Sequence, residues 1–135
     1  MKTIIINIFF LLLNISCVAQ FVGHTKLEFL SVVENTEKYS DVNYLGSYDN
    51  GHSYYSFKSL SEVSITSFVY FNPSGICHKQ KDTYSSNDRS KIELILAQRC
   101  DKIGNIWIER SNDLTLSYTI EEISGIFLLI SELLK

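Results

Sequence analysis

The residues of this sequence best suited to chemistry are a cysteine and a histidine that stand side by side, Cys77 and His78. A cysteine nucleophile needs a base within hydrogen-bonding reach and a third group that orients the base. Neighbouring side chains of a strand point to opposite faces, so His78 does not readily reach the sulfur of Cys77. His24 or His52 would have to supply the base from elsewhere in the fold. We therefore expect no catalytic residue at this pair.

The same side chains are the candidates for a metal centre. Zinc sites hold cysteine and histidine ligands at recognisable spacings, and the histidines and cysteines of this chain match no such pattern. We predict neither a metal site nor a cofactor, and we interpret His78 as the solvated neighbour of a structural cysteine.

A disulfide is the other interpretation of Cys77, with Cys100 as its partner. One of the three cysteines lies in a segment that we expect to be removed, and an even number in an exported chain favours a bridge. A strand from Cys77 to Tyr84 rises about 23 Å, and a helix from Asp88 to Cys100 returns about 18 Å. The pair then lies at one level, but Ile76 and Cys77 can both face the helix only if a bulge follows the turn. Without a bridge, Cys77 is a free thiol.

The first residues have the pattern of a secretory signal peptide. Lys2 supplies a positive start, and an apolar run from Ile4 to Leu13 is too short to span a bilayer. Ala19 is suited to precede a cleavage site, so residues 1–20 are expected to be cleaved. We predict that the protein is periplasmic or secreted.

Lipidation at Cys17 is the alternative. The segment "LLLNISC" resembles the signal of bacterial lipoproteins, which are cut before a cysteine that then carries lipid. The chain departs from that signal at Asn14, where the family prefers leucine. This alternative predicts a lipid-anchored envelope protein.

Charge and hydropathy argue against nucleic-acid binding and against a transmembrane span. The chain has a net charge of −3, and removal of Lys2 makes the mature protein more acidic. A nucleic-acid-binding protein normally carries a dense basic patch, and here only Lys79 and Lys81 cluster, so we expect no nucleic-acid partner. No later segment approaches the length of a transmembrane span.

The tyrosines and the single tryptophan suggest a binding surface. Asn50-Gly51 is a strong turn signal, and it sits in "YDNGHSYY" between polar side chains and tyrosines. Trp107 faces outward if Ile106 and Ile108 face the core. The candidate binding residues are Asp49, Asn50, His52, Tyr54, Tyr70 and Trp107.

The patterning predicts which elements position these residues. Apolar spacing predicts a short helix over 24–37 with Leu27, Leu30 and Val33 inward. Strands are expected on both sides of Asn50-Gly51, over 62–71, over 76–84 as an edge strand, and as a hairpin over 106–120. The clearest helix runs over 85–104, and 126–134 is a strand or a helix, with strand favoured.

The predicted fold is α+β. A single antiparallel sheet of about 5–6 strands packs on one main helix, with a short N-terminal helix beside it. The 135 residues suffice for one domain, which we place at 21–135.

The stretch "YFNPSGIC", the capped helix after it and "IWIER" together resemble a pattern of small, uncharacterised secreted bacterial proteins. The resemblance covers residues 54–110 and implies an α+β fold but no activity.

Three functions remain open. The first is an exported non-catalytic protein that binds another protein, as an inhibitor, an immunity-type partner or an envelope component. The second is a binder of a small ligand or glycan, which requires a pocket lined by aromatic rings. The third is a thiol-dependent enzyme.

Overall fold

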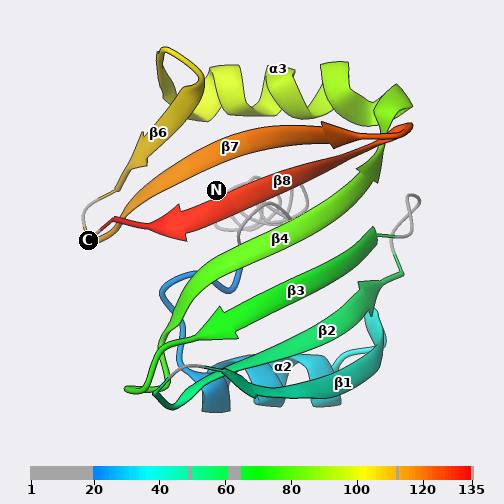
Figure 1. The fold of residues 1–135 in the computed structure, drawn as a ribbon, viewed down its shortest axis with the longest axis vertical. Helices are drawn as coiled ribbons and strands as arrows, with labels where there is room; N and C mark the ends of the chain where they lie inside the picture. The colour runs from blue at the N-terminus through cyan, green and yellow to red at the C-terminus, as the bar shows by residue number, and fades with distance from the viewer. Residues whose placement is uncertain (1–19, 49, 61–64, 112, 135) are drawn as a thin grey trace, which may run out of the picture.

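The computed structural model describes residues 20–48, 50–60, 65–111 and 113–134, and its fold is drawn in Figure 1. The elements in chain order are α2 (Lys26–Asn35), β1 (Tyr39–Tyr48), β2 (His52–Ser59), β3 (Ile65–Phe71), β4 (Cys77–Ser85), a 3-10 turn (Ser86–Asp88), α3 (Arg89–Arg99), β5 (Asp101–Ile103), β6 (Ile106–Arg110), β7 (Thr115–Ile123) and β8 (Ile126–Leu133). All eight strands join one sheet in the order β1-β2-β3-β4-β8-β7-β6-β5. Every neighbouring pair is antiparallel.

The predicted α+β fold with 5–6 strands on one main helix is wrong. The described chain is mostly sheet, with eight strands and two helices of 10 and 11 residues. A strand was expected before Asn50-Gly51, but the extent of β1 was not predicted, because its Asp41, Asn43 and Gly46 disrupt any alternating apolar pattern. β5 lies where the long helix was expected to continue, because Cys100 is extended, with φ −124° and ψ 158°, and ends α3.

The position of β4 also differs from the prediction. We expected a polar edge strand, but β4 lies between β3 and β8. The C-terminal β8, which the sequence left open between strand and helix, completes the pairing by placing Leu129 opposite Asp82. Lys79 and Lys81 are therefore polar because they occupy a solvent-facing side of a central strand, and not because the strand is an edge.

Both predicted hairpins are confirmed. The strand predicted over 62–71 is confirmed as β3 over Ile65–Phe71, and residues 62–64 lie outside the described residues. The first turn forms because Asn50 and Gly51 adopt positive φ, at 55° and 89°, which asparagine and glycine tolerate. Gly75, with φ 79°, makes the turn between β3 and β4 in the same way. These two turns fix the pairing register of β1 with β2 and of β3 with β4.

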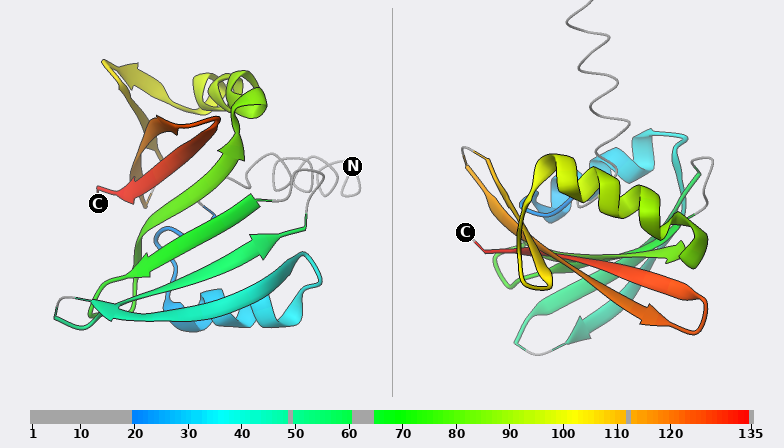
Figure 2. Two further views of the ribbon diagram at one scale, coloured as in Figure 1. Left: turned by 45° about the vertical axis from the view of Figure 1, so that its right-hand side comes forward. Right: turned by 90° about the horizontal axis from the view of Figure 1, so that it is seen from above.

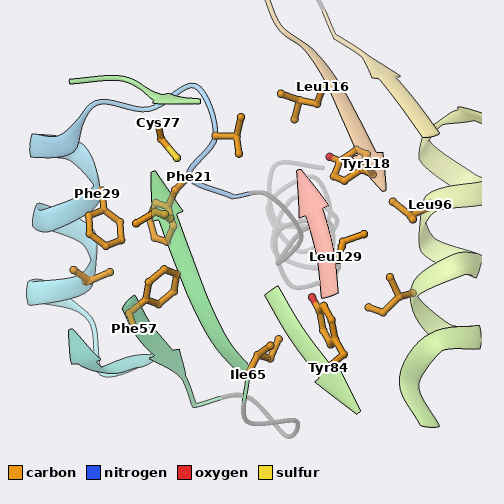
Figure 3. Close-up of a cluster of buried hydrophobic side chains, with 14 of the residues drawn as sticks. Phe21, Phe29, Phe57, Ile65, Cys77, Tyr84, Leu96, Leu116, Tyr118 and Leu129 are labelled. Atoms are coloured by element: carbon orange, nitrogen blue, oxygen red, sulfur yellow. The ribbon is translucent and has the colours of Figure 1, made fainter. Parts of the chain in front are cut away.

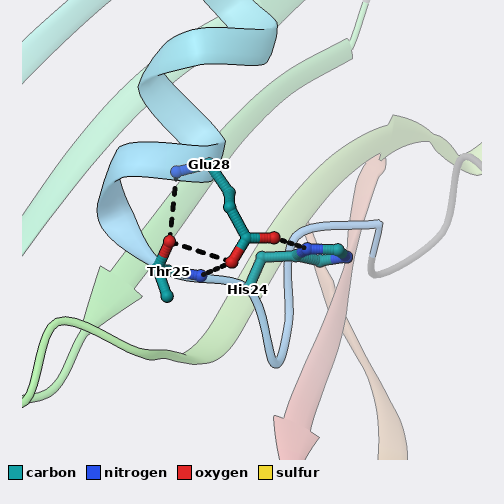
Figure 4. A network of polar contacts seen from close by, with 3 residues as sticks. All are labelled: His24, Thr25 and Glu28. Carbon is teal, nitrogen blue, oxygen red and sulfur yellow. Dashed lines mark hydrogen bonds and ion pairs between the residues drawn. The ribbon is translucent and has the colours of Figure 1, made fainter.

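The short N-terminal helix is confirmed, and of its three predicted apolar positions Val33 is buried and Leu30 packs on the core, whereas Leu27 is not buried. Thr25 and Glu28 form a reciprocal capping box, and His24 Nδ1 lies 2.9 Å from Glu28 (Figure 4). Phe29 and Val33 are buried, whereas Leu27 is 79% exposed. The helix turns Phe29 and not Leu27 toward the sheet, because the sheet presents aromatic rings to Phe29.

Both helices lie against the same face of the sheet, here called the inner face (Figure 2). Phe29 of α2 packs against Phe57 and Phe71, with ring centres 5.5 Å apart in both pairs. Leu96 of α3 belongs to the same buried cluster as Tyr118 (Figure 3). Side chains that alternate with these point to the opposite, outer face, which neither helix covers.

Candidate functional site

The outer face carries a cluster of aromatic and basic side chains at the end of the sheet formed by β1 to β4. We call this cluster the outer patch. Its members are Tyr48, His52, Tyr54, Tyr70, His78, Lys79 and Lys81.

Strand register brings the outer patch together. Tyr54 of β2 lies opposite Tyr70 of β3, and Tyr70 lies opposite Lys79 of β4. Tyr48 and His52 are paired at the end of the first hairpin. Cross-strand pairs on one face are the units that stabilise a sheet, so this cluster is fixed by the fold and not by loop conformation.

Tyr70 stands at the centre of the outer patch. Its ring is stacked with Tyr54 at 5.6 Å and an interplanar angle of 6°, and Tyr48 meets it edge-on at 6.1 Å. The ammonium groups of Lys79 and Lys81 both lie 5.6 Å from its ring centre. Because β2 and β4 flank β3 on opposite sides, Tyr54 and the lysines flank the ring of Tyr70 on its two sides.

The pKa values of two groups of the outer patch differ from their ordinary values. Burial, and then proximity to Tyr48 and Tyr54, raises the pKa of Tyr70, so its phenol stays protonated. Burial lowers the pKa of His78, and nearby His52 acts in the same direction. The rings of these two histidines lie 5.5 Å apart. At neutral pH the patch thus presents phenol hydroxyls and lysine ammonium groups as donors.

The structure unites three of the six predicted binding residues. His52, Tyr54 and Tyr70 belong to the outer patch, and Asn50 lies in the adjoining turn. Asp49 lies outside the described residues. Trp107 is elsewhere: it pairs with the buried Tyr118, packs against the core, and has Lys102 over its ring at 5.0 Å.

Four further members of the outer patch were not predicted as binding residues. In the sequence, Lys79 and Lys81 stand out only as a small basic cluster, and His78 only as the solvated neighbour of Cys77. Tyr48 was not singled out. These four residues could have been recognised only from the alternation of side chains along β4, combined with the strand register that the Asn50-Gly51 turn imposes.

The bulge considered for Cys77 is present. The register shifts between Tyr70 and Phe71, so that Phe71 pairs with Cys77 while Tyr70 pairs with Lys79. The extra residue lets Cys77 face the core, where it is 0% exposed. Cys77 can therefore point inward although Lys79 points outward.

Both cysteines are nevertheless free in the structure. Burial raises the pKa of Cys77 to about 12 and that of Cys100 to about 11. The thiolate is the reactive form of cysteine, so neither sulfur has the character of a nucleophile. Cys17, the candidate for lipidation, lies outside the described residues, as does the predicted signal peptide except for Gln20.

Two polar clusters on the inner face were not predicted. Ser67 donates to Asp82 at 2.5 Å, and Gln80 donates to the same carboxylate oxygen at 3.0 Å. These three side chains are at most 2% exposed, so they are enclosed by the core. These hydrogen bonds tie β3 to β4 within the core.

The second polar cluster joins α3 to the sheet. Arg99 binds both carboxylate oxygens of Glu109, at 2.8 and 2.9 Å, and Tyr118 donates to the same carboxylate at 2.5 Å. Burial and this hydrogen bond raise the pKa of Tyr118. A bidentate arginine–carboxylate pair is geometrically specific, and here it ties the last turn of α3 to β6.

Within the described part of the chain, no group of three or more histidine, cysteine or acidic residues is arranged to hold a metal ion. None of the described helices is long and apolar enough to span a membrane.

No protein-family model, curated protein or solved structure matches this chain. The function is therefore inferred from the geometry of the outer patch.

Proposed function

We propose that the protein is an exported, non-catalytic binding protein that docks onto another protein through the outer patch. The observation that carries this proposal is a group of seven ordered side chains on a sheet face that neither helix covers. Tyrosine buries a large area while few torsions are lost, and rings that are already held by one another lose still less on binding.

A protein surface suits the outer patch better than a sugar does. Glycan binding usually requires an aromatic face that is open to the ligand, and Tyr70 has Tyr54 on one side and two lysines on the other. The patch is half-buried along its strands, which suits contact with a partner across a broad, shallow area. The glycan alternative is accordingly our second candidate.

Export is the other half of the proposal, and it is supported by Lys2 and the apolar run from Ile4 to Leu13. Mass spectrometry of the chain recovered from the producing cells tests it. We expect a mature species that begins after Ala19 or Gln20, found outside the cytosol. A lipid-modified species that begins at Cys17 would favour the envelope-anchored alternative, and an intact chain in the cytosol would refute export.

Docking is tested by site-specific photo-crosslinking in cells. A photoreactive amino acid is placed at position 54 in the outer patch and, in a matched control, at the exposed position 97 on α3. We expect a discrete cross-linked protein from position 54 only, and a weaker product when Tyr70→Ala is added. Equal products from both positions, or none from position 54, would contradict docking through this face.

A further inference from the structure

The outer patch is positively charged although the chain is not. The net charge is −3, yet Lys79 and Lys81 bring two ammonium groups to the same distance, 5.6 Å, from one ring centre. The described outward-facing residues of β2, β3 and β4 include no aspartate or glutamate. Two like charges are thus held together on three strands whose described outward-facing residues include no acidic group.

Among the acidic groups of neighbouring elements, Glu132 bears on this charge, and it also opposes the lowering of the pKa of His78. Glu132 of β8 lies opposite Lys79 in the ladder, but the ion pairs of the described residues do not include one between them. Asp82 of β4 points to the inner face, where it binds Ser67 and Gln80. A bound anion would relieve the repulsion between the two lysines.

The polar groups that surround the lysines are donors as well. Tyr70 keeps its proton because burial and neighbouring tyrosines raise its pKa, and Tyr54 stacks directly beside it. Ammonium and phenol groups together form charge-assisted hydrogen bonds with carboxylates. The patch therefore offers both charge and directed hydrogen bonds to an acidic group.

We infer that the docking partner presents aspartate or glutamate side chains, which bind between Lys79 and Lys81 and accept hydrogen bonds from Tyr54 and Tyr70. This inference rests on the proposed function, because it specifies the chemistry of the surface that the outer patch contacts. Complementary charge sets the register and the encounter rate of such an interface.

Single-stranded nucleic acid is a less suitable polyanion for this surface. Bases bind such proteins by stacking on open aromatic faces along a positively charged groove. Here Tyr70 is flanked on both sides, and two lysines on an acidic chain do not form a track for a phosphate backbone. Carboxylates spaced along a protein surface require no such stacking.

The inference is tested by NMR titration of the isotope-labelled full chain with decaglutamate and decaglutamine peptides and with oligothymidylate of the same length. We expect amide shifts on β3 and β4 with decaglutamate, none with decaglutamine, and weaker binding as salt rises. The variant Lys79→Glu/Lys81→Glu should lose about tenfold or more of the affinity for decaglutamate. The matched control Lys38→Glu/Lys91→Glu, at two exposed positions outside the patch, should lose less than about twofold.

Three results would overturn the inference. The first is an equal loss in the two double variants, which would show unspecific attraction. The second is tighter binding of oligothymidylate than of decaglutamate, which would assign the patch to nucleic acid. The third is the absence of shifts on β3 and β4. If position 54 still cross-links specifically, that third result refutes an acidic partner and leaves docking intact, whereas failure of both experiments refutes both proposals.

Discussion

Replacement of two adjacent residues, Tyr70 and Phe71, by alanine tests the alternation that creates the outer patch. Phe71 is 0% exposed on the inner face and contacts the rings of Phe29 and Tyr55. Tyr70 is half-buried on the outer face. Both substitutions remove an aromatic ring from β3, so a difference in their effects reports the face on which each ring lies.

The structure gives the expected magnitudes. Truncation of a fully buried phenylalanine costs about 3–5 kcal/mol, because it removes buried apolar surface and leaves a cavity. Truncation of Tyr70 removes one stacked pair, of about 0.5–1.5 kcal/mol, and exposed cation–π contacts of about 0.5–1 kcal/mol. We therefore expect Tyr70→Ala to lower the free energy of unfolding by about 1–2.5 kcal/mol and Phe71→Ala by at least about 3 kcal/mol.

Urea unfolding monitored by circular dichroism separates these values. With a slope of about 2 kcal/mol/M, the midpoint should fall by about 0.5–1.2 M for Tyr70→Ala and by about 1.5–2.5 M for Phe71→Ala. Equal shifts, or a larger shift for Tyr70→Ala, would show that β3 has the opposite orientation and that the outer patch does not exist. The small shift also makes Tyr70→Ala a folded variant that is suitable for the cross-linking experiment.

Other predictions concern the ionisable groups. Glu109→Gln should lower the free energy of unfolding by about 1–3 kcal/mol in urea denaturation, because it removes the charge that Arg99 binds at 2.8 Å. In thiol labelling of the native protein, Cys100 should react at least about tenfold more slowly than free cysteine, since burial raises its pKa to about 11, and Cys77 should react only after unfolding. A whole-protein mass that is lower by two hydrogens would instead reveal a bridge between them. Burial lowers the pKa of His78 from 6.5 in the folded protein. As the pH falls, this histidine is therefore protonated in the unfolded chain before it is protonated in the folded protein. Stability should therefore fall as the pH drops below about 6.5, and His78→Gln should make that fall shallower in urea titrations at several pH values.

Much of the local structure was predictable because it depends on local signals. The Asn50-Gly51 turn and the alternation around Val69 each specify a conformation within a few residues. The capping box of Thr25 and Glu28 is equally local, although Phe29 and not Leu27 became the buried residue. Periodicity indicates a helix better than it indicates which side the sheet will cover.

The sheet as a whole was harder to predict because its order is set by contacts that are distant in sequence. β8 pairs with β4, about fifty residues away in the chain, and this pairing converts a polar edge strand into a central one. Trp107 illustrates the same difficulty in one residue. Ile106 is 41% exposed, and Trp107 packs on the core beside Tyr118. The apolar character of Ile106 and Ile108 had instead favoured an outward-facing Trp107.

The bulge in β4 explains why the candidate site could be predicted only in part. In a regular strand, Cys77 shares a face with Lys79 and Lys81, so either the core loses a buried residue or the outer patch loses its lysines. One extra residue between Cys77 and Lys79 reverses the alternation, and β4 then serves both faces. No residue type in "GICHKQK" marks this change, because bulges are determined by pairing with the neighbouring strand. The sequence therefore revealed Tyr54 and Tyr70 of the outer patch, while the charge of the patch became visible only through the register of β4.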